Sequence, residues 1–371
     1  MSRALVALLL LLPLTLSAQE RARNVVLFIA DAGGTSVLSA ASLHGYGAPR
    51  RLFVQRMPHI GLSTTSTATQ IVSDSAAGMT AIVTGQKTHN GVIAQSASAV
   101  RGTSDGEPLK TLLEYAEERG LSTGIISNDA LTGATPASLY AHVNDRAMTA
   151  EIFKQVFAPR FGDGPDVMIG AGRPAVTKAL AAAGSDLDTV ARPSERAVLS
   201  SLSDVPSKAT RAIVLLESST FDMTEAIRAA HRMLSKNRKG YFLMVEGDVH
   251  TDRVRPGLDR MVMLDKAIEQ TAALVGRDTL VLFTADHSFD LRLRGGLLAT
   301  PLLDGIDEAQ ELSQTEKRRD VRTPAVRMDN GHTGEEVLVA ATGPGAARVR
   351  GYMDNTDLFR VMLAAFGWKA E

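Results

Sequence analysis

The residues best suited to chemistry in this chain stand directly beside short apolar runs. Asp286 and His287 follow one such run, Asp31 follows another, and His332 lies between two glycines just before a third. Any one of them alone is more often a cap, turn or structural residue, because short polar side chains readily bond nearby main-chain groups. An adjacent carboxylate and imidazole nevertheless begin a zinc site, and several such positions at strand ends together indicate metal binding.

A second polar segment, EGDVHTD, begins at Glu246 directly after an apolar run. If the extended conformation continues, Glu246, Asp248 and His250 share one face, which brings two carboxylates and an imidazole together. If a helical turn begins at Asp248 instead, that residue pairs with Asp252 four positions later. A solvated polar loop explains any one of these residues, but it does not explain the set.

The segment DSAAG, which begins at Asp74, has the composition of a helix start. An ordinary cap by Asp74 or Ser75 is one explanation. A serine at a helix N-terminus is also well placed for phosphoryl chemistry, because the free amides and the helix dipole favour an anionic phosphate and an ionised hydroxyl.

The apolar runs are rich in β-branched residues and predict buried strands of a sheet that is covered on both faces. Strands are predicted at 24–30, 124–127, 212–216, 240–245, 279–284 and 337–341, and helices at 109–119, 147–157, 224–237 and 258–275. This alternation predicts an α/β fold with a mostly parallel central sheet and helices on both faces. Ligands bind beyond the carboxyl ends of such strands, so the polar residues there, including those at 127–129, are the first candidates for a site.

The N-terminal segment and the composition limit what kind of protein this chain can be. Residues 1–18 carry an apolar core at 4–14 and small residues near Ala18, which is typical of a cleaved secretory signal and predicts an exported protein, periplasmic or secreted. The chain has no cysteine, so any metal must be held by His, Asp, Glu or hydroxyl groups. We expect one catalytic domain at 19–371, in which 288–330 is a lid or surface excursion, and no membrane anchor in the mature chain.

Charge excludes one class of partner. The formal net charge is −1 and the charges are mixed along the chain, so no basic face indicates nucleic-acid binding.

The chain resembles the alkaline phosphatase family in six segments that follow one another in the family's order. These segments are the strand followed by Asp31-Ala-Gly-Gly, Val72-Ser-Asp-Ser75-Ala-Ala, Ala134-Thr135-Pro-Ala with Ala141-His142-Val143 and Arg146, Val245-Glu246-Gly247, Thr284-Ala-Asp286-His287, and Gly331-His332-Thr333-Gly334. The resemblance implies two zinc ions, one magnesium ion and small phosphorylated substrates. A homodimer is left open.

The resemblance also implies individual roles at the zinc sites. Ser75 corresponds to the nucleophile. Asp31 would bridge the second zinc and the magnesium, Asp286 and His287 would complete the second zinc, and His332 would bind the first zinc.

Two further roles concern the magnesium and the phosphate. Thr135 and Glu246 would complete the magnesium shell. Arg146 would hold two phosphate oxygens through its paired donors, as guanidinium geometry allows.

The segment after Glu246 departs from the family. Thr251 and Arg255 stand where relatives carry an Asp and a His, and the segment is shorter by about a turn. We therefore expect Asp248 and His250 to supply the remaining ligands of the first zinc, with Asp252 as the alternative.

The magnesium segment departs as well, because Gly133 has no side chain where relatives often place a polar group. This departure predicts a weaker site, or one that another cation fills.

The expected activity is hydrolysis of phosphate monoesters through a phosphoserine at Ser75. A phosphodiesterase or a sulfatase on the same kind of fold is the enzymatic alternative, although these would favour a threonine or a modified cysteine as nucleophile. A non-catalytic periplasmic protein that binds phosphate or metal is the alternative from a different class.

Overall fold

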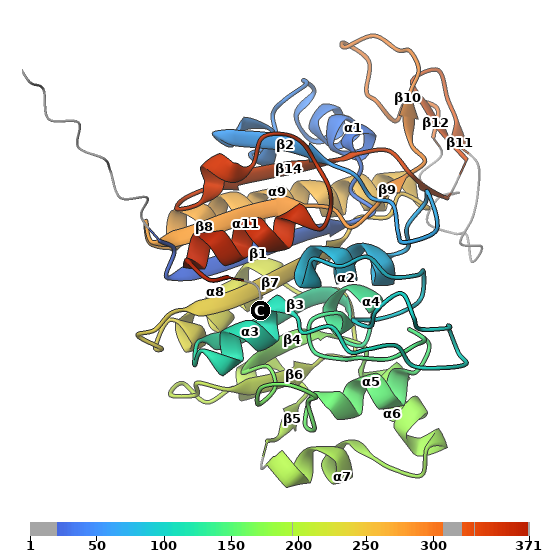
Figure 1. The fold of residues 1–371 in the computed structure, drawn as a ribbon. Coiled ribbons are helices and arrows are strands. Elements are labelled where there is room, and N and C mark those ends of the chain that lie inside the picture. Colours follow the sequence, from blue (N-terminus) through green and yellow to red (C-terminus); the bar gives the residue numbers. More distant parts are fainter. Residues whose placement is uncertain (1–20, 195, 307–320, 330, 370–371) are drawn as a thin grey trace, which may run out of the picture.

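A computed structural model describes residues 21–194, 196–306, 321–329 and 331–369 of the chain. Figure 1 shows a central sheet with helices packed on its two faces. The expected signal at 1–18 lies outside the described residues and stays a prediction. Within the described part, no helix is both long enough and apolar enough to cross a membrane.

The central sheet has ten strands in the order β15-β2-β14-β8-β1-β7-β3-β4-β6-β5. Its strands are β1 (Asn24–Asp31), β2 (His59–Ser63), β3 (Ser122–Ala130), β4 (Val167–Ala171), β5 (Val198–Leu199), β6 (Ala212–Leu215), β7 (Tyr241–Asp248), β8 (Thr279–Thr284), β14 (Val337–Thr342) and β15 (Gly351–Met353). All pairings are parallel except those of β14, which runs antiparallel to both β2 and β8. The mostly parallel α/β architecture predicted from the sequence is therefore confirmed.

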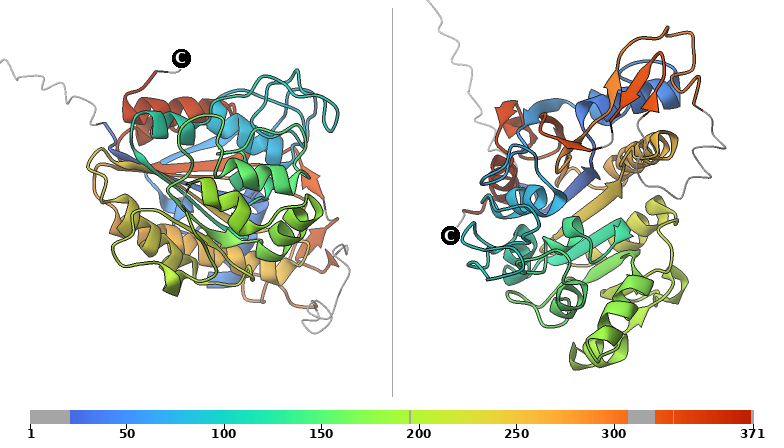
Figure 2. Two further views of the ribbon diagram at one scale, coloured as in Figure 1. Left: turned by 90° about the horizontal axis from the view of Figure 1, so that it is seen from below. Right: turned by 90° about the vertical axis from the view of Figure 1, so that its right-hand side faces the viewer.

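Helices cover both faces of the sheet, as the two further views in Figure 2 show. One face packs against α2 (Ser75–Thr84), α3 (Leu112–Glu118), α4 (Ala134–Ala137), α5 (Thr149–Gln155), α6 (Arg173–Ala182) and α11 (Asp357–Phe366). The other face packs against α1 (Thr35–Tyr46), α8 (Met223–Leu234) and α9 (Val254–Leu274). The short helix α7 (Leu187–Ala191) lies near the sheet edge, next to β5.

Alternation along the buried strands decides which residues face which layer of helices. Val25, Leu27 and Ile29 of β1 belong to the core on the α2 side, whereas Val26 and Phe28 belong to the core on the α9 side. Side chains point to opposite faces at successive positions of a strand. Asp31, the next odd-numbered residue of β1, therefore lies on the α2 side. The same alternation applies to β7 and β8.

The predicted elements exist, with shifted ends. The strand predicted at 240–245 begins one residue later and continues to Asp248, and the helix predicted at 258–275 begins earlier, at Val254. Strand β4 and helix α6, with its proline in the first turn, were not predicted, nor were β15, at one edge of the sheet, and its neighbour β2. Both β2 and β15 are short and partly exposed, so they lack the long apolar run that marks the central strands.

The described part of the segment at 288–330 lies outside the central sheet, and Figure 1 shows it beside α1. It contains β9 (Ser288–Phe289), β10 (Arg292–Leu293), β11 (Val321–Arg322) and β12 (Val326–Met328), of which the last three form a small sheet. Strand β9 pairs with β13 (His332–Thr333), and this pairing fixes the approach of His332 to the main sheet. A cavity of about 890 Å³ between α1 and this segment contains none of the predicted metal ligands.

Helix α2 packs unusually close to the end of β8, and this contact generates a prediction. A Cβ on Gly78 would collide with the main-chain carbonyl oxygen of Asp286, which cannot rotate away as a side chain can. We expect Gly78→Ala to lower the free energy of unfolding by about 1–3 kcal/mol, the usual cost of overpacking a rigid core. Urea denaturation measures this change.

The matched control is Gly331→Ala, because a Cβ there meets no atom within 4 Å. It should leave the free energy of unfolding nearly unchanged. If Gly78→Ala were as stable as the control, the close contact between α2 and the end of β8 would be contradicted.

Candidate metal and phosphoryl-transfer site

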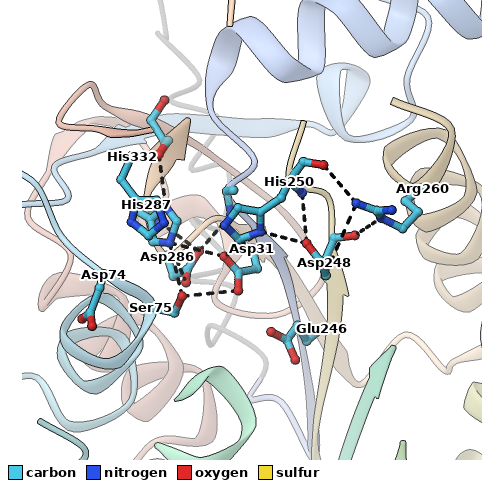
Figure 3. A network of polar contacts seen from close by, with 12 residues as sticks. Asp31, Asp74, Ser75, Glu246, Asp248, His250, Arg260, Asp286, His287 and His332 are labelled. Carbon is cyan, nitrogen blue, oxygen red and sulfur yellow. Dashed lines mark hydrogen bonds and ion pairs between the residues drawn. The ribbon is translucent and has the colours of Figure 1, made fainter. Parts of the chain in front are cut away.

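Ser75 is the first residue of α2 and is buried at the carboxyl ends of β1 and β8, as Figure 3 shows. The helix begins here because Asp74 accepts a hydrogen bond from the main-chain N–H of Ala77, at 3.1 Å. The hydroxyl of Ser75 lies 3.3 Å from Oδ2 of Asp31 and 3.2 Å from Nε2 of His287. A serine in these contacts is both at a helix N-terminus and among potential metal ligands.

Strand alternation brings the carboxylates to the same face as Ser75. Asp31 is the residue of β1 opposite Asp248 of β7, and Glu246 lies opposite Ile29. Asp286 follows β8 and lies fully buried beside them. Parallel neighbours in register share a face of the sheet, so four acidic side chains converge at one edge.

The possible ligand atoms form two compact groups. Asp31, Asp286 and His287 offer atoms that all lie within 4.8 Å of one another, and so do His250, His287 and His332. The rings of His287 and His332 stack with their centroids 3.8 Å apart. Carboxylate and imidazole donors at this density suit zinc or a similar divalent cation.

Each of the three histidines has its Nδ1 beside an oxygen acceptor. His332 faces the main-chain oxygen of Ser73 at 3.0 Å, and His287 faces that of Ser288 at 3.1 Å. His250 faces the carboxylate of Asp248 at 2.8 Å. An Nδ1–H donated to these oxygens leaves the lone pair on Nε2, which is the arrangement expected for imidazoles that bind metal.

The buried carboxyl groups of the cluster need positive charge nearby if they are to be ionised. Burial raises the pKa of Asp286, and the carboxylate of Asp31 raises it further. The pKa of Glu246 is also raised, first by burial and then by Asp31 and Asp129. One oxygen each of Asp31 and Asp286, and the hydroxyl of Thr135, are buried without a hydrogen-bond partner. These unpartnered oxygens fit a site that holds cations.

Arg146 lies close to Ser75 because it forms an ion pair with the residue before it. Its Nη1 lies 3.0 Å from Oδ2 of Asp74, the residue before Ser75, and its side chain is half-buried. Its main-chain N–H donates to the oxygen of Gly91 at 2.8 Å, which anchors the loop. The resemblance implied a phosphate-binding role for Arg146, which stays a prediction. It did not reveal this partner, because the two residues lie 72 positions apart.

The divergent segment after Glu246 stays extended. Strand β7 runs to Asp248 and α9 begins only at Val254, so the helical alternative that would pair Asp248 with Asp252 does not occur. His250 enters a compact ligand group, whereas Asp248 and Asp252 belong to neither. The carboxylate of Asp252 accepts from the main-chain N–H of its neighbour Arg253.

Asp248 instead connects His250 to α9. One oxygen bonds His250, and the other lies 3.8 Å from Nη2 of Arg260. The guanidinium of Arg260 also donates to the main-chain oxygens of Asp248 and His250, at 2.6 and 2.9 Å. Sequence reasoning missed Arg260, because its position in α9 carries no motif.

The remaining predicted residues lie on the neighbouring strand and helix. Thr135 is in α4, with a fully buried side chain, and Glu246 accepts a hydrogen bond from the hydroxyl of Ser127 in β3. Ser127 belongs to the polar strand end at 127–129 that the sequence marked as a candidate.

The chain is similar to known phosphatases along most of its length. The chain is 30% identical to the streptomycin-6-phosphate phosphatase of Streptomyces griseus over 96% of this chain and 94% of that protein. It is 27% identical to the alkaline phosphatase of Escherichia coli K12, over 95% and 88% of the two chains.

Solved structures share the fold. The alkaline phosphatase of the Antarctic bacterium TAB5 superposes with a TM-score of 0.77 at 23% identity, covering 95% of this chain and all of the other. The Thermus thermophilus alkaline phosphatase gives 0.74 at 23% identity, covering 95% and 93%.

A buried serine at a helix N-terminus, beside clustered carboxylates and imidazoles on a mostly parallel sheet, defines a metal-dependent phosphatase. The family model described as alkaline phosphatase matches residues 22–173 and 214–300. The chain belongs to the alkaline phosphatase family and is a phosphatase hydrolase.

The charge on His250 gives a prediction about pH. Burial opposes protonation, but the carboxylates of Asp31 and Asp248 outweigh it and raise the pKa of His250 from 6.5 to about 9. The protonated ring therefore stabilises the metal-free fold fully below pH 6.5, and this contribution is lost as the pH rises through about 9. In chelator-treated protein, we expect the stability difference between wild type and His250→Asn to decline over this range.

Urea unfolding at fixed ionic strength measures this difference at each pH. Because zinc displaces the proton from a ligating imidazole, the zinc-saturated protein should not show the same decline. A difference that stays constant with pH in the chelator-treated protein would contradict the raised pKa.

Proposed function

We propose that the protein hydrolyses phosphate monoesters through a covalent phosphoserine at Ser75. The observation that carries this proposal is the contact of the Ser75 hydroxyl with Asp31 and His287, both of which belong to one compact ligand group. A cation held by Asp31 and His287 would favour the ionised form of this hydroxyl, which could then attack phosphorus directly.

We propose two zinc sites and one magnesium site at the strand ends. Asp31, Asp286 and His287, with the Ser75 oxygen, would hold the second zinc, and His250 with His332 would hold most of the first. Thr135, Glu246 and Asp31 would contribute to the magnesium site. When bound, these cations supply positive charge that stabilises an alkoxide, the transferring phosphoryl group and the departing oxygen.

The chain's own residues position the substrate. Arg146 would hold two phosphate oxygens through its guanidinium, and its pairing with Asp74 keeps it beside Ser75 before substrate arrives. The first turn of α2 adds a favourable dipole for the phosphate. The Ser75 oxygen forms a bond to phosphorus as the bond to the alcohol breaks, and water then releases inorganic phosphate and restores the hydroxyl.

Experiment can also distinguish two alternative functions. A diesterase or sulfatase on this fold would need to accommodate a different ester. A serine nucleophile, together with a relative named streptomycin-6-phosphate phosphatase, favours the monoester. A binding protein without catalysis would retain the metal ligands but turn over no substrate. We also propose export to the periplasm or medium, which the composition of residues 1–18 supports.

Release of nitrophenol from nitrophenyl phosphate tests the function. We expect wild type to turn over this monoester faster than the corresponding diester and sulfate, and to lose activity with a chelator. Ser75→Ala should lower turnover by orders of magnitude while metal content stays near wild type, because the hydroxyl is one ligand among many. Acid quenching with labelled phosphate should trap a phosphoserine only in the wild type.

The matched control is Ser73→Ala, because the Ser73 hydroxyl bonds only a neighbouring main-chain oxygen in the described structure. It should retain most of the activity. Full activity in Ser75→Ala would exclude this serine as the nucleophile, and metal-bound wild type that releases no nitrophenol would favour the binding protein.

The first zinc site generates a separate prediction. We expect His250→Ala and Asp248→Ala each to lower bound zinc by about one equivalent, because the first removes a ligand and the second removes either a ligand or the group that orients it. Asp252→Ala serves as the matched control and should keep both equivalents. Metal analysis after dialysis at a fixed free zinc concentration distinguishes the three variants. Loss of zinc in Asp252→Ala with none in His250→Ala would reverse the assignment.

A further inference from the structure

The predicted magnesium site lacks a side chain at Gly133, and the local backbone explains why. The main-chain N–H of Gly133 donates to the oxygen of Ala130 in a tight turn. A Cβ built on Gly133 would lie only 2.8 Å from that same oxygen. Any larger residue would therefore disturb the turn, so this position cannot supply a ligand without rebuilding the loop.

The carboxylate of Asp129 occupies the space next to Gly133. Oδ2 of Asp129 lies 3.3 Å from the point where a Cβ on Gly133 would stand. Asp129 reaches this place because the pairing of β3 with β4 is irregular between Ser127 and Ala130. The N–H of Asp129 then donates to the Ser127 hydroxyl at 2.9 Å, and the same hydroxyl donates to Glu246.

Asp129 lies close enough to the other carboxylates of the site for their charges to act on it. Its pKa is raised, first by partial removal from solvent and then by the charges of Asp248 and Asp31. The charge of Asp129 acts in turn on Glu246. These groups repel one another unless a cation lies between them.

A second observation points to a ligand at this place. Thr135 has a relative exposure of 1%, and its hydroxyl is buried without a hydrogen-bond partner. Helix α4, which carries Thr135, packs against β7, which carries Glu246. A buried hydroxyl without a partner is costly, and coordination to a cation would satisfy it.

We propose that Asp129 is a ligand of the third metal site, where it takes the place of the side chain that is absent at Gly133. The proposal rests on the proposed function, since it concerns the site formed by Asp31, Thr135 and Glu246. Asp129 belongs to neither compact ligand group, and its side chain is exposed, which leaves it room to turn toward Glu246.

The donor set determines the preferred ion. Asp31, Asp129, Thr135 and Glu246 offer oxygen atoms only, which suits a hard cation such as Mg²⁺ or Mn²⁺ better than zinc. The zinc groups, in contrast, each contain imidazole nitrogen. The exposure of Asp129 leaves this third site more open to solvent than the buried group around Asp286.

Metal binding without turnover tests the proposal. Full-length protein with both zinc sites saturated is titrated with Mn²⁺ and followed by the loss of the free-ion electron paramagnetic resonance signal, and bound Mg²⁺ is counted after equilibrium dialysis. We expect Asp129→Asn to weaken binding of the third ion by at least about tenfold, while the zinc content stays unchanged. Asp188→Asn, an exposed carboxylate in α7, is the matched control and should bind like wild type.

The outcomes separate this inference from the proposed function. Wild-type affinity for Mn²⁺ and Mg²⁺ in Asp129→Asn, or loss of zinc rather than of the third ion, would overturn the role of Asp129 and leave the phosphatase mechanism standing. A protein that binds no zinc and releases no nitrophenol would instead overturn the proposed function itself. Urea unfolding of Asp129→Asn in the presence of chelator should show a variant at least as stable as wild type, because the neutral side chain no longer repels the other carboxylates. Such a result excludes a folding defect as the cause of weaker binding.

Discussion

Mutual repulsion between buried carboxylates at one edge of the sheet is the constraint on which the rest of the structure depends. Asp31, Glu246 and Asp286 are almost fully buried. All three lie at the carboxyl ends of neighbouring strands, so their charges lie close together. Removing a charge from water costs on the order of several kcal/mol unless it is paired. The raised pKa values of Glu246 and Asp286 express this cost. Divalent cations remove it, so the fold that creates the repulsion also creates the metal centre.

The surrounding elements hold the ligands in place by ordinary packing and hydrogen bonding. Small residues in α2 let this helix approach the end of β8 closely. This close packing places Ser75 beside the carboxylates. Main-chain oxygens of Ser73 and Ser288 fix two imidazoles, and Asp248 with Arg260 fixes a third. The ligand atoms are thus preorganised by contacts outside the site, which is the usual requirement for tight and selective metal binding.

The sequence was sufficient for the parts of the site that follow from local rules. Apolar runs located the central strands. Strand β7 continues through Glu246 to Asp248, as the extended alternative required, and His250 lies beside His287 and His332. What it could not provide are contacts between segments far apart in the chain. Examples are the pair of Arg146 with Asp74 and the anchoring of Asp248 by Arg260. Such partners depend on helix packing and loop geometry, which no single-sequence pattern encodes, and strand ends shifted for the same reason.

The central claim is that this edge of the sheet binds two zinc ions beside Ser75. Anomalous diffraction at the zinc absorption edge, from crystals of the metal-replete protein, tests it most directly. The account predicts one peak among Asp31, Asp286 and His287, and a second beside His250 and His332. Absence of both peaks, or peaks only at places remote from these residues, would contradict it.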